Sequence, residues 1–94
     1  MGGGDGISIC RSTANASDGN ILGNLSFHSY ASGSYHANAE AKIEAVAETG
    51  QSGSNAPTGL HFYTKPSGTG PGASPTHKMA ITSGGSVNLS LIHI

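Results

Sequence analysis

The chain has 94 residues, a formal net charge of −1 at pH 7, 15 glycines and no tryptophan. Leu, Ile, Val and Phe number only 16, below the roughly 20% at which a single globular core becomes doubtful. The low net charge differs from the high charge typical of intrinsically disordered chains. The four Lys and Arg residues are scattered, which excludes a basic patch for binding nucleic acid. No stretch is long and apolar enough to span a membrane. We therefore predict that the chain needs copies of itself, or more chain, to bury enough apolar surface.

Turn signals divide the chain into short pieces with strand patterns. Asp18-Gly19-Asn20 and Gly84-Gly85-Ser86 are each followed by an apolar β-branched residue, as expected of tight turns that begin a strand. In the first of these strands positions 21, 23, 25 and 27 are predicted to share one face, with Gly23 allowing a close backbone approach. The predicted strands are residues 7–9, 21–27, 60–64 and 79–82.

Residues 38–48 fit two structures. Their good helix formers, with Asn38 as a cap, favour a helix. The same residues alternate small apolar side chains with Glu and Lys, which favours a half-buried strand whose solvent face carries Glu40, Glu44, Glu48 and Lys42. Local sequence leaves both open.

Candidate chemistry is sparse. The five histidines, His28, His36, His61, His77 and His93, lack metal-ligand spacing, so we expect no metal site and no cofactor. Cys10 is the only cysteine, which excludes an intrachain disulfide, and we expect it partly buried at the end of the first strand. No nucleophile motif or carboxylate pair in an aromatic cleft is present, so we expect no catalytic residues.

Four motifs occur in an order that resembles bacteriophage tail fibre and tail spike proteins. They are GNILGNLSF, AKIEA, LHFYT and KMAITSGGSVNL, and together they extend over most of residues 5–88. The resemblance implies an all-β fold of short antiparallel strands and Gly/Ser-rich turns in an intertwined, β-prism-like or β-helix-like homotrimer. It implies a strand at 41–45, and it implies that this region often precedes a C-terminal self-cleaving chaperone domain.

The chain departs from this pattern at its end, where the family would continue with a Gly-rich strand. One DNA sequence that encodes LSLIHI resembles the transposon end used in sequencing libraries. We therefore predict that residues 1–88 are a tail-fibre-like segment of a longer protein, from an environmental gene fragment, and that residues 89–94 are a non-native tail. The alternative is a genuine last strand.

The implied function is a structural and adhesive, non-enzymatic component of a virion tail fibre, assembled in the host cytoplasm and attaching to a bacterial glycan or protein receptor. Loops 29–35 and 66–75 are the expected receptor contacts, with Tyr30, Tyr35, Ser67 and Thr69 as candidate residues. Two alternatives remain: a bacterial surface or secreted β-repeat module, and a depolymerase-type tail spike enzyme. We also expect an isolated monomer to be unfolded or prone to aggregation.

Overall fold

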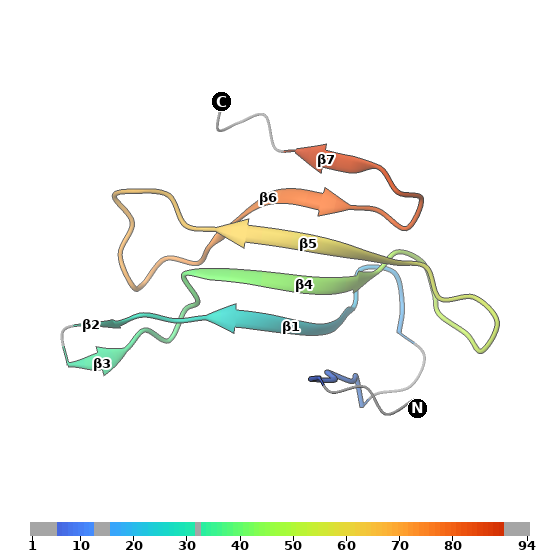
Figure 1. The fold of residues 1–94 in the computed structure, drawn as a ribbon, viewed down its shortest axis with the longest axis horizontal. Helices are drawn as coiled ribbons and strands as arrows, with labels where there is room; N and C mark the ends of the chain where they lie inside the picture. Colours follow the sequence, from blue (N-terminus) through green and yellow to red (C-terminus); the bar gives the residue numbers. More distant parts are fainter. Residues whose placement is uncertain (1–5, 13–15, 32, 90–94) are drawn as a thin grey trace.

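Five antiparallel strands form one twisted sheet in the order β1-β4-β5-β6-β7 in a computed structural model that describes residues 6–12, 16–31 and 33–89 (Figure 1). A separate two-stranded hairpin extends from one end of this sheet. The sheet strands are β1 (Ile21–Phe27), β4 (Ala41–Ala47), β5 (Thr58–Thr64), β6 (Thr76–Ile81) and β7 (Val87–Leu89), and the hairpin strands are β2 (Tyr30–Ala31) and β3 (Ser34–Tyr35).

The all-β prediction is confirmed, and residues 41–47 form a strand rather than a helix. Every residue of β4 pairs with β5, and β4 also pairs with β1 on its other side. A central strand with two neighbours satisfies its backbone groups on both edges, and this outweighs the local helix propensity of Ala, Glu and Lys. No helix among the described residues has the length and hydropathy needed to cross a bilayer.

The predicted turns into β1 and β7 both form. Gly19 and Gly85 have φ of 85° and 92°, a conformation that glycine adopts without a steric penalty. The Gly19 N–H donates to the carbonyl of Ala47 at 2.8 Å, which joins the turn to the end of β4. In the second turn the Thr82 N–H donates to the Ser86 carbonyl at 2.9 Å.

The strand predicted at residues 7–9 does not form. The side chain of Ile9 lies instead against Gly23, at a point where any Cβ on residue 23 would collide with it. Ile9 therefore packs onto the face of the sheet and not along its edge, so its backbone does not join the ladder. Cys10 is exposed, which corrects the expectation that it is partly buried.

A register irregularity between Ile21 and Gly23 corrects the predicted face of β1. Ile21 pairs with Val46, whereas Gly23 pairs with the adjacent Ala45. Directly paired residues share a face and successive residues alternate, so Ile21 leaves the face that carries Gly23, Leu25 and Phe27.

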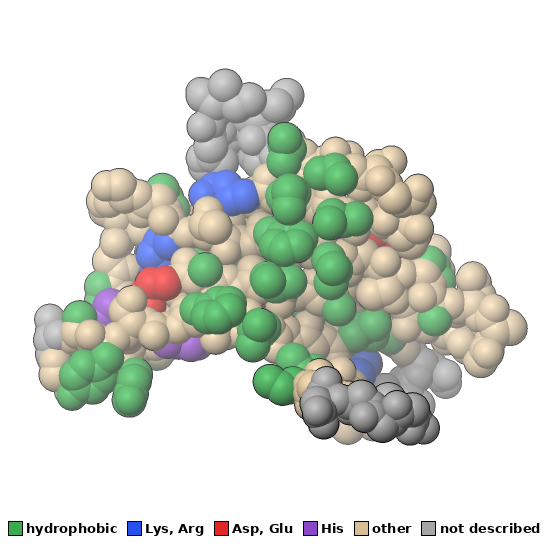
Figure 2. Space-filling model, in the orientation of Figure 1, with side chains coloured by type: hydrophobic (Ala, Val, Ile, Leu, Met, Phe, Trp, Pro, Cys, Tyr) green, Lys and Arg blue, Asp and Glu red, His purple; other side chains and the backbone are tan. Residues whose placement is uncertain are grey.

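The two faces of the sheet differ in polarity. One face carries two cross-strand rows of mostly apolar residues, and we call it the apolar face (Figure 2). The other carries Lys42, Glu44 and Tyr63, and the buried side chains of Glu44, Val46 and Ala80 lie on it. The rows of the apolar face are Leu25–Ile43–Phe62–Met79–Leu89 and Gly23–Ala45–Leu60–Ile81–Val87.

We call the second face, which carries Lys42 and Glu44, the polar face. The burial of Glu44 corrects the expectation that the charged side chains of this face are all exposed to solvent. Glu44 is 4% exposed, and its carboxylate lies 2.8 Å from Lys42 Nζ. Lys42 Nζ also lies 4.6 Å from the centre of the Tyr63 ring, a favourable cation–π distance. The polar face is thus covered by its own paired side chains.

Candidate functional site

The candidate site lies at the end of the sheet where the β2–β3 hairpin and the loop between β5 and β6 project together (Figure 1). These are the two segments that the sequence predicts as contact loops. Residue 32 of the hairpin lies outside the described residues.

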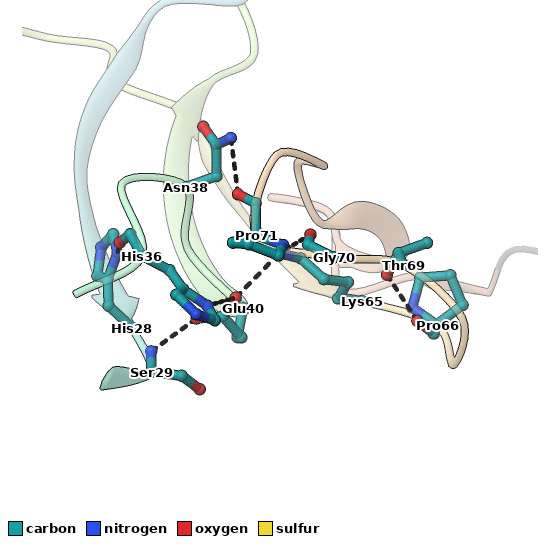
Figure 3. Close-up of polar contacts among 10 residues, drawn as sticks. All are labelled: His28, Ser29, His36, Asn38, Glu40, Lys65, Pro66, Thr69, Gly70 and Pro71. Atoms are coloured by element: carbon teal, nitrogen blue, oxygen red, sulfur yellow. Dashed lines mark hydrogen bonds and ion pairs between the residues drawn. The ribbon is translucent and has the colours of Figure 1, made fainter. Parts of the chain in front are cut away.

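Glu40 connects the two loops (Figure 3). Its Oε1 accepts a 2.6 Å hydrogen bond from the Ser29 N–H, and its Oε2 lies 3.0 Å from His36 Nδ1. Lys65 Nζ, from the other loop, donates to the same Oε2 at 2.9 Å. One carboxylate therefore binds both ends of the hairpin and the first residue of the proline-rich loop, which joins β5 to β6 over residues 65–75.

These donors stabilise the ionised form of Glu40. The hydrogen bond from His36 is the largest cause, followed by the Ser29 N–H and Lys65, and together they lower the pKa of Glu40 to about 2. The side chain of Lys65 is only 8% exposed, so its charge is largely committed to this contact. The site thus has a fixed internal ion pair beneath its loops.

Further bonds shape the proline-rich loop. Lys65 Nζ donates to the Gly70 carbonyl at 3.2 Å, and Asn38 Nδ2 donates to the Pro71 carbonyl at 3.2 Å. Thr69 Oγ1 donates to the Pro66 carbonyl at 2.7 Å, which closes a turn inside the loop (Figure 3). The loop is therefore held in one arrangement against the hairpin.

An open groove of about 550 Å³ lies between hairpin and loop. Its lining has an aromatic ring, a hydroxyl, an imidazole and an amide, but no carboxylate and no Lys or Arg. This arrangement suits stacking and neutral hydrogen bonding to a ligand. The lining residues are Ala31, Ser34, Tyr35, His36, Ala37, Asn38, Pro71 and Gly72.

The structure brings together only some of the candidate contact residues. Tyr30 and Tyr35 pair across the hairpin with ring centres 4.8 Å apart in an edge-to-face arrangement, and both remain well exposed. Thr69 is exposed, but its hydroxyl is used within its own loop. Ser67 is exposed on the same loop and is not in the groove lining.

Sequence reasoning missed the residues that organise this end, namely His36, Asn38, Glu40 and Lys65. The spacing of His36 and Glu40 was a weak local signal, because four residues separate them. The pairing with Lys65, 25 residues later, follows only from the antiparallel register of β4 and β5. Among the described residues no three His, Cys, Asp or Glu side chains group as metal ligands, and His93 lies outside that range.

Comparisons with known proteins place the fold among phage fibre domains. The chain matches two structures of the carboxy-terminal domain of the bacteriophage T5 L-shaped tail fibre, one determined with its intramolecular chaperone domain. Each match has a TM-score of 0.77 and 14% identity and covers 95% of this chain. The chain spans only 33% and 23% of those two proteins.

No protein-family model matches the chain, and no curated protein matches it in sequence. At 14% identity the structural likeness shows a shared fold.

Proposed function

We propose that this chain is a structural and adhesive segment of a bacteriophage tail fibre, present in the virion as a homotrimer and assembled in the host cytoplasm. The observation that carries the proposal is the fold, which matches a tail fibre domain over 95% of the chain. The order of the four sequence motifs supports it independently. In this proposal residues 1–88 belong to a longer fibre protein, and the segment has no catalytic role.

The loop end supplies the adhesive part of the proposal. Tyr30 and Tyr35 expose large aromatic surface, and the groove beside Tyr35 offers neutral polar groups. Exposed rings and hydroxyl or amide groups favour a bacterial surface glycan over a charged receptor, with a surface protein as the other candidate. Three linked copies would convert weak single contacts into firm attachment.

A binding assay on bacterial cells tests attachment. Labelled protein is applied to a panel of strains, and Tyr30→Ala and Tyr35→Ala are compared with Ser54→Ala, which changes an exposed loop outside the groove. We expect the tyrosine variants to lose most binding and Ser54→Ala to keep it. Equal binding by all three would contradict attachment through this end.

Two treatments of the cells separate the receptor classes. Periodate oxidation of surface sugars should abolish binding if the receptor is a glycan, whereas protease treatment should do so if it is a protein. Release of reducing sugar ends during incubation would contradict the non-catalytic role. Light scattering tests self-association, and a mass of one 9.3 kDa chain for a folded species would contradict the homotrimer.

A further inference from the structure

The apolar face is too exposed to be the surface of a monomer. Leu25, Leu60 and Val87 are 48%, 43% and 58% exposed, although they lie on the same face of adjacent or nearby strands. Figure 2 shows a band of hydrophobic side chains that crosses this face of the molecule. Such a continuous band is typical of an interaction surface.

The size of the exposed surface supports this interpretation. The accessible area is 6414 Å², about 1,400 Å² more than the roughly 5,000 Å² expected of a compact 9.3 kDa monomer. A standard interface buries about 800 Å² on each partner. The chain therefore exposes more surface than a compact monomer of its mass, by more than one such interface would remove, which favours a second copy of this chain as the partner of the apolar face.

The chemistry of the two faces indicates which one is covered. The two rows of the apolar face contain no charged residue. On the other face Lys42 and Glu44 already pair with each other beneath Tyr63. The polar face needs no partner, whereas the apolar face can only be matched by another apolar surface.

The apolar face is asymmetric. At its β1–β4 side lies an open groove of about 300 Å³, which Ile9 bounds where it covers Gly23 and which Leu25, Ile43, Ala45 and Leu60 also line. At the opposite edge of the sheet, Val87 of β7 lies in the same cross-strand row as Ala45, and its side chain is exposed. A groove cannot fill a second groove, but a projecting side chain of suitable chemistry can.

We infer that Val87 of one copy inserts into the groove beside Ala45 of the next copy, so that three chains close into a ring with their apolar faces inward. This inference rests on the self-association in the proposed function and adds the surface and the mode of contact. Contact between different parts of two identical subunits is heterologous, and such a contact forms a closed ring when the rotation returns to the first copy.

Cysteine cross-linking of the whole chain tests this contact. In a Cys10→Ser background, which removes the only native thiol, Ala45→Cys is combined with Val87→Cys. Because the disulfide joins the two different sites on neighbouring copies, oxidation should give a covalent three-chain species on a non-reducing gel. Each single variant should remain uncross-linked.

The matched control pair is Ser26→Cys with Asn88→Cys. These residues follow Leu25 and Val87 in sequence but lie on the opposite face of β1 and β7, outside the groove. Cross-linking of this control pair, or efficient dimers from Val87→Cys alone, would overturn the inferred contact. A three-chain protein whose Ala45/Val87 pair does not cross-link would also overturn it while leaving the proposed function intact.

A charge substitution provides a second measurement if the cysteine pair does not fold. Val87→Asp places an unpaired charge in the contact, whereas Asn88→Asp places the same charge on the polar face. We expect Val87→Asp to raise the dissociation constant of the assembly more than about tenfold and Asn88→Asp to leave it nearly unchanged. Equal effects would contradict the inference, and a folded monomeric parent chain would contradict both the inference and the homotrimer.

Discussion

The carboxylate of Glu48 binds Ser83 twice, across 35 residues of sequence. Glu48 Oε1 accepts from the Ser83 hydroxyl at 2.6 Å, and Oε2 accepts from the Ser83 N–H at 3.0 Å. Glu48 follows β4, and Ser83 lies in the turn between β6 and β7, so the contact passes over the end of β5. It fixes the turn that begins the edge strand β7.

Ser83→Ala tests the strength of this contact. Loss of a charge-assisted hydrogen bond from the hydroxyl should lower the free energy of unfolding by about 1 kcal/mol. Urea unfolding measures the change. Ser86→Ala, in the same turn, is the control, because the Ser86 hydroxyl forms no hydrogen bond with any residue that the structure describes. Equal stabilities of the two variants would show that the Glu48 contact adds nothing.

Gly59 lies directly beneath Glu48 in β5. A Cβ at residue 59 would come within 2.5 Å of Glu48 Oε2 and 3.0 Å of the Ile81 carbonyl oxygen. We therefore expect Gly59→Ala to destabilise the fold by about 1–3 kcal/mol.

A double-mutant cycle with Glu48→Ala isolates the cause of that effect. The Glu48→Ala background lacks the carboxylate but keeps the contact with the Ile81 carbonyl. In this background Gly59→Ala should therefore lower the free energy of unfolding by less than it does in the parent chain. A cost that is the same in both backgrounds would assign the whole effect to the backbone. Gly53→Ala, where a Cβ would meet open space, is the matched control.

Glu40 should make the loop end sensitive to acid. Its pKa is lowered from the ordinary value of 4.5 to about 2, so the contribution of its ionised form is fully present above pH 4.5. It is lost as the pH falls from 4.5 towards 2, because the carboxylate is then protonated in the folded chain as well. Hydrogen exchange of the Ser29 amide, read at several pH values, should report this loss.

Glu40→Gln provides the comparison, because it keeps the size of the side chain and removes its charge. We expect the variant to lose the additional acid sensitivity and to protect the Ser29 amide less at neutral pH. Identical pH profiles for the variant and the parent chain would contradict the assigned role of Glu40.

The phenol of Tyr63 should ionise at a higher pH than an ordinary tyrosine. Burial, and then the nearby negative charge of Glu44 and a hydrogen bond to it, raise the pKa of the Tyr63 phenol. In a Tyr30→Phe/Tyr35→Phe background only this phenol remains, so its ionisation can be followed by absorbance. Glu44→Gln should lower the pKa while leaving the part due to burial. Glu48→Gln is the control, and equal shifts in the two variants would contradict a specific effect of Glu44.

Local patterns were sufficient for much of the fold. The turn at Gly19 and the strand 21–27 match the structure, because Asp-Gly-Asn chemistry and apolar alternation act over a few residues. The strand predicted at residues 60–64 begins two residues earlier in the structure, at Thr58, because Thr58 and Gly59 pair with Ala47 and Val46 of β4. Strand 79–82 was shifted towards the N-terminus for a similar reason, since Thr76 and His77 find partners on β5.

The candidate site was less predictable. The exposed tyrosines were visible in the sequence as loop aromatics, but Glu40 resembled one of three evenly spaced acidic residues on a solvent face. In the structure those three residues have different surroundings: Glu40 joins the loops, Glu44 is buried with Lys42, and Glu48 holds Ser83. The partners of Glu40 and Glu48 lie 25 and 35 residues away in the chain, whereas Lys42 lies on the same strand as Glu44.

The sequence by itself determined turns at its glycines, most of the strands that these turns begin, too few large apolar residues for a core of its own, and two projecting loops. Those properties depend on composition and on interactions between residues that are near neighbours in the chain. Only the tertiary structure decided which face of the sheet is apolar, where its groove and the projecting Val87 lie, and which carboxylate holds the loops together. Strand order and register decide those features, because they alone bring residues tens of positions apart into contact.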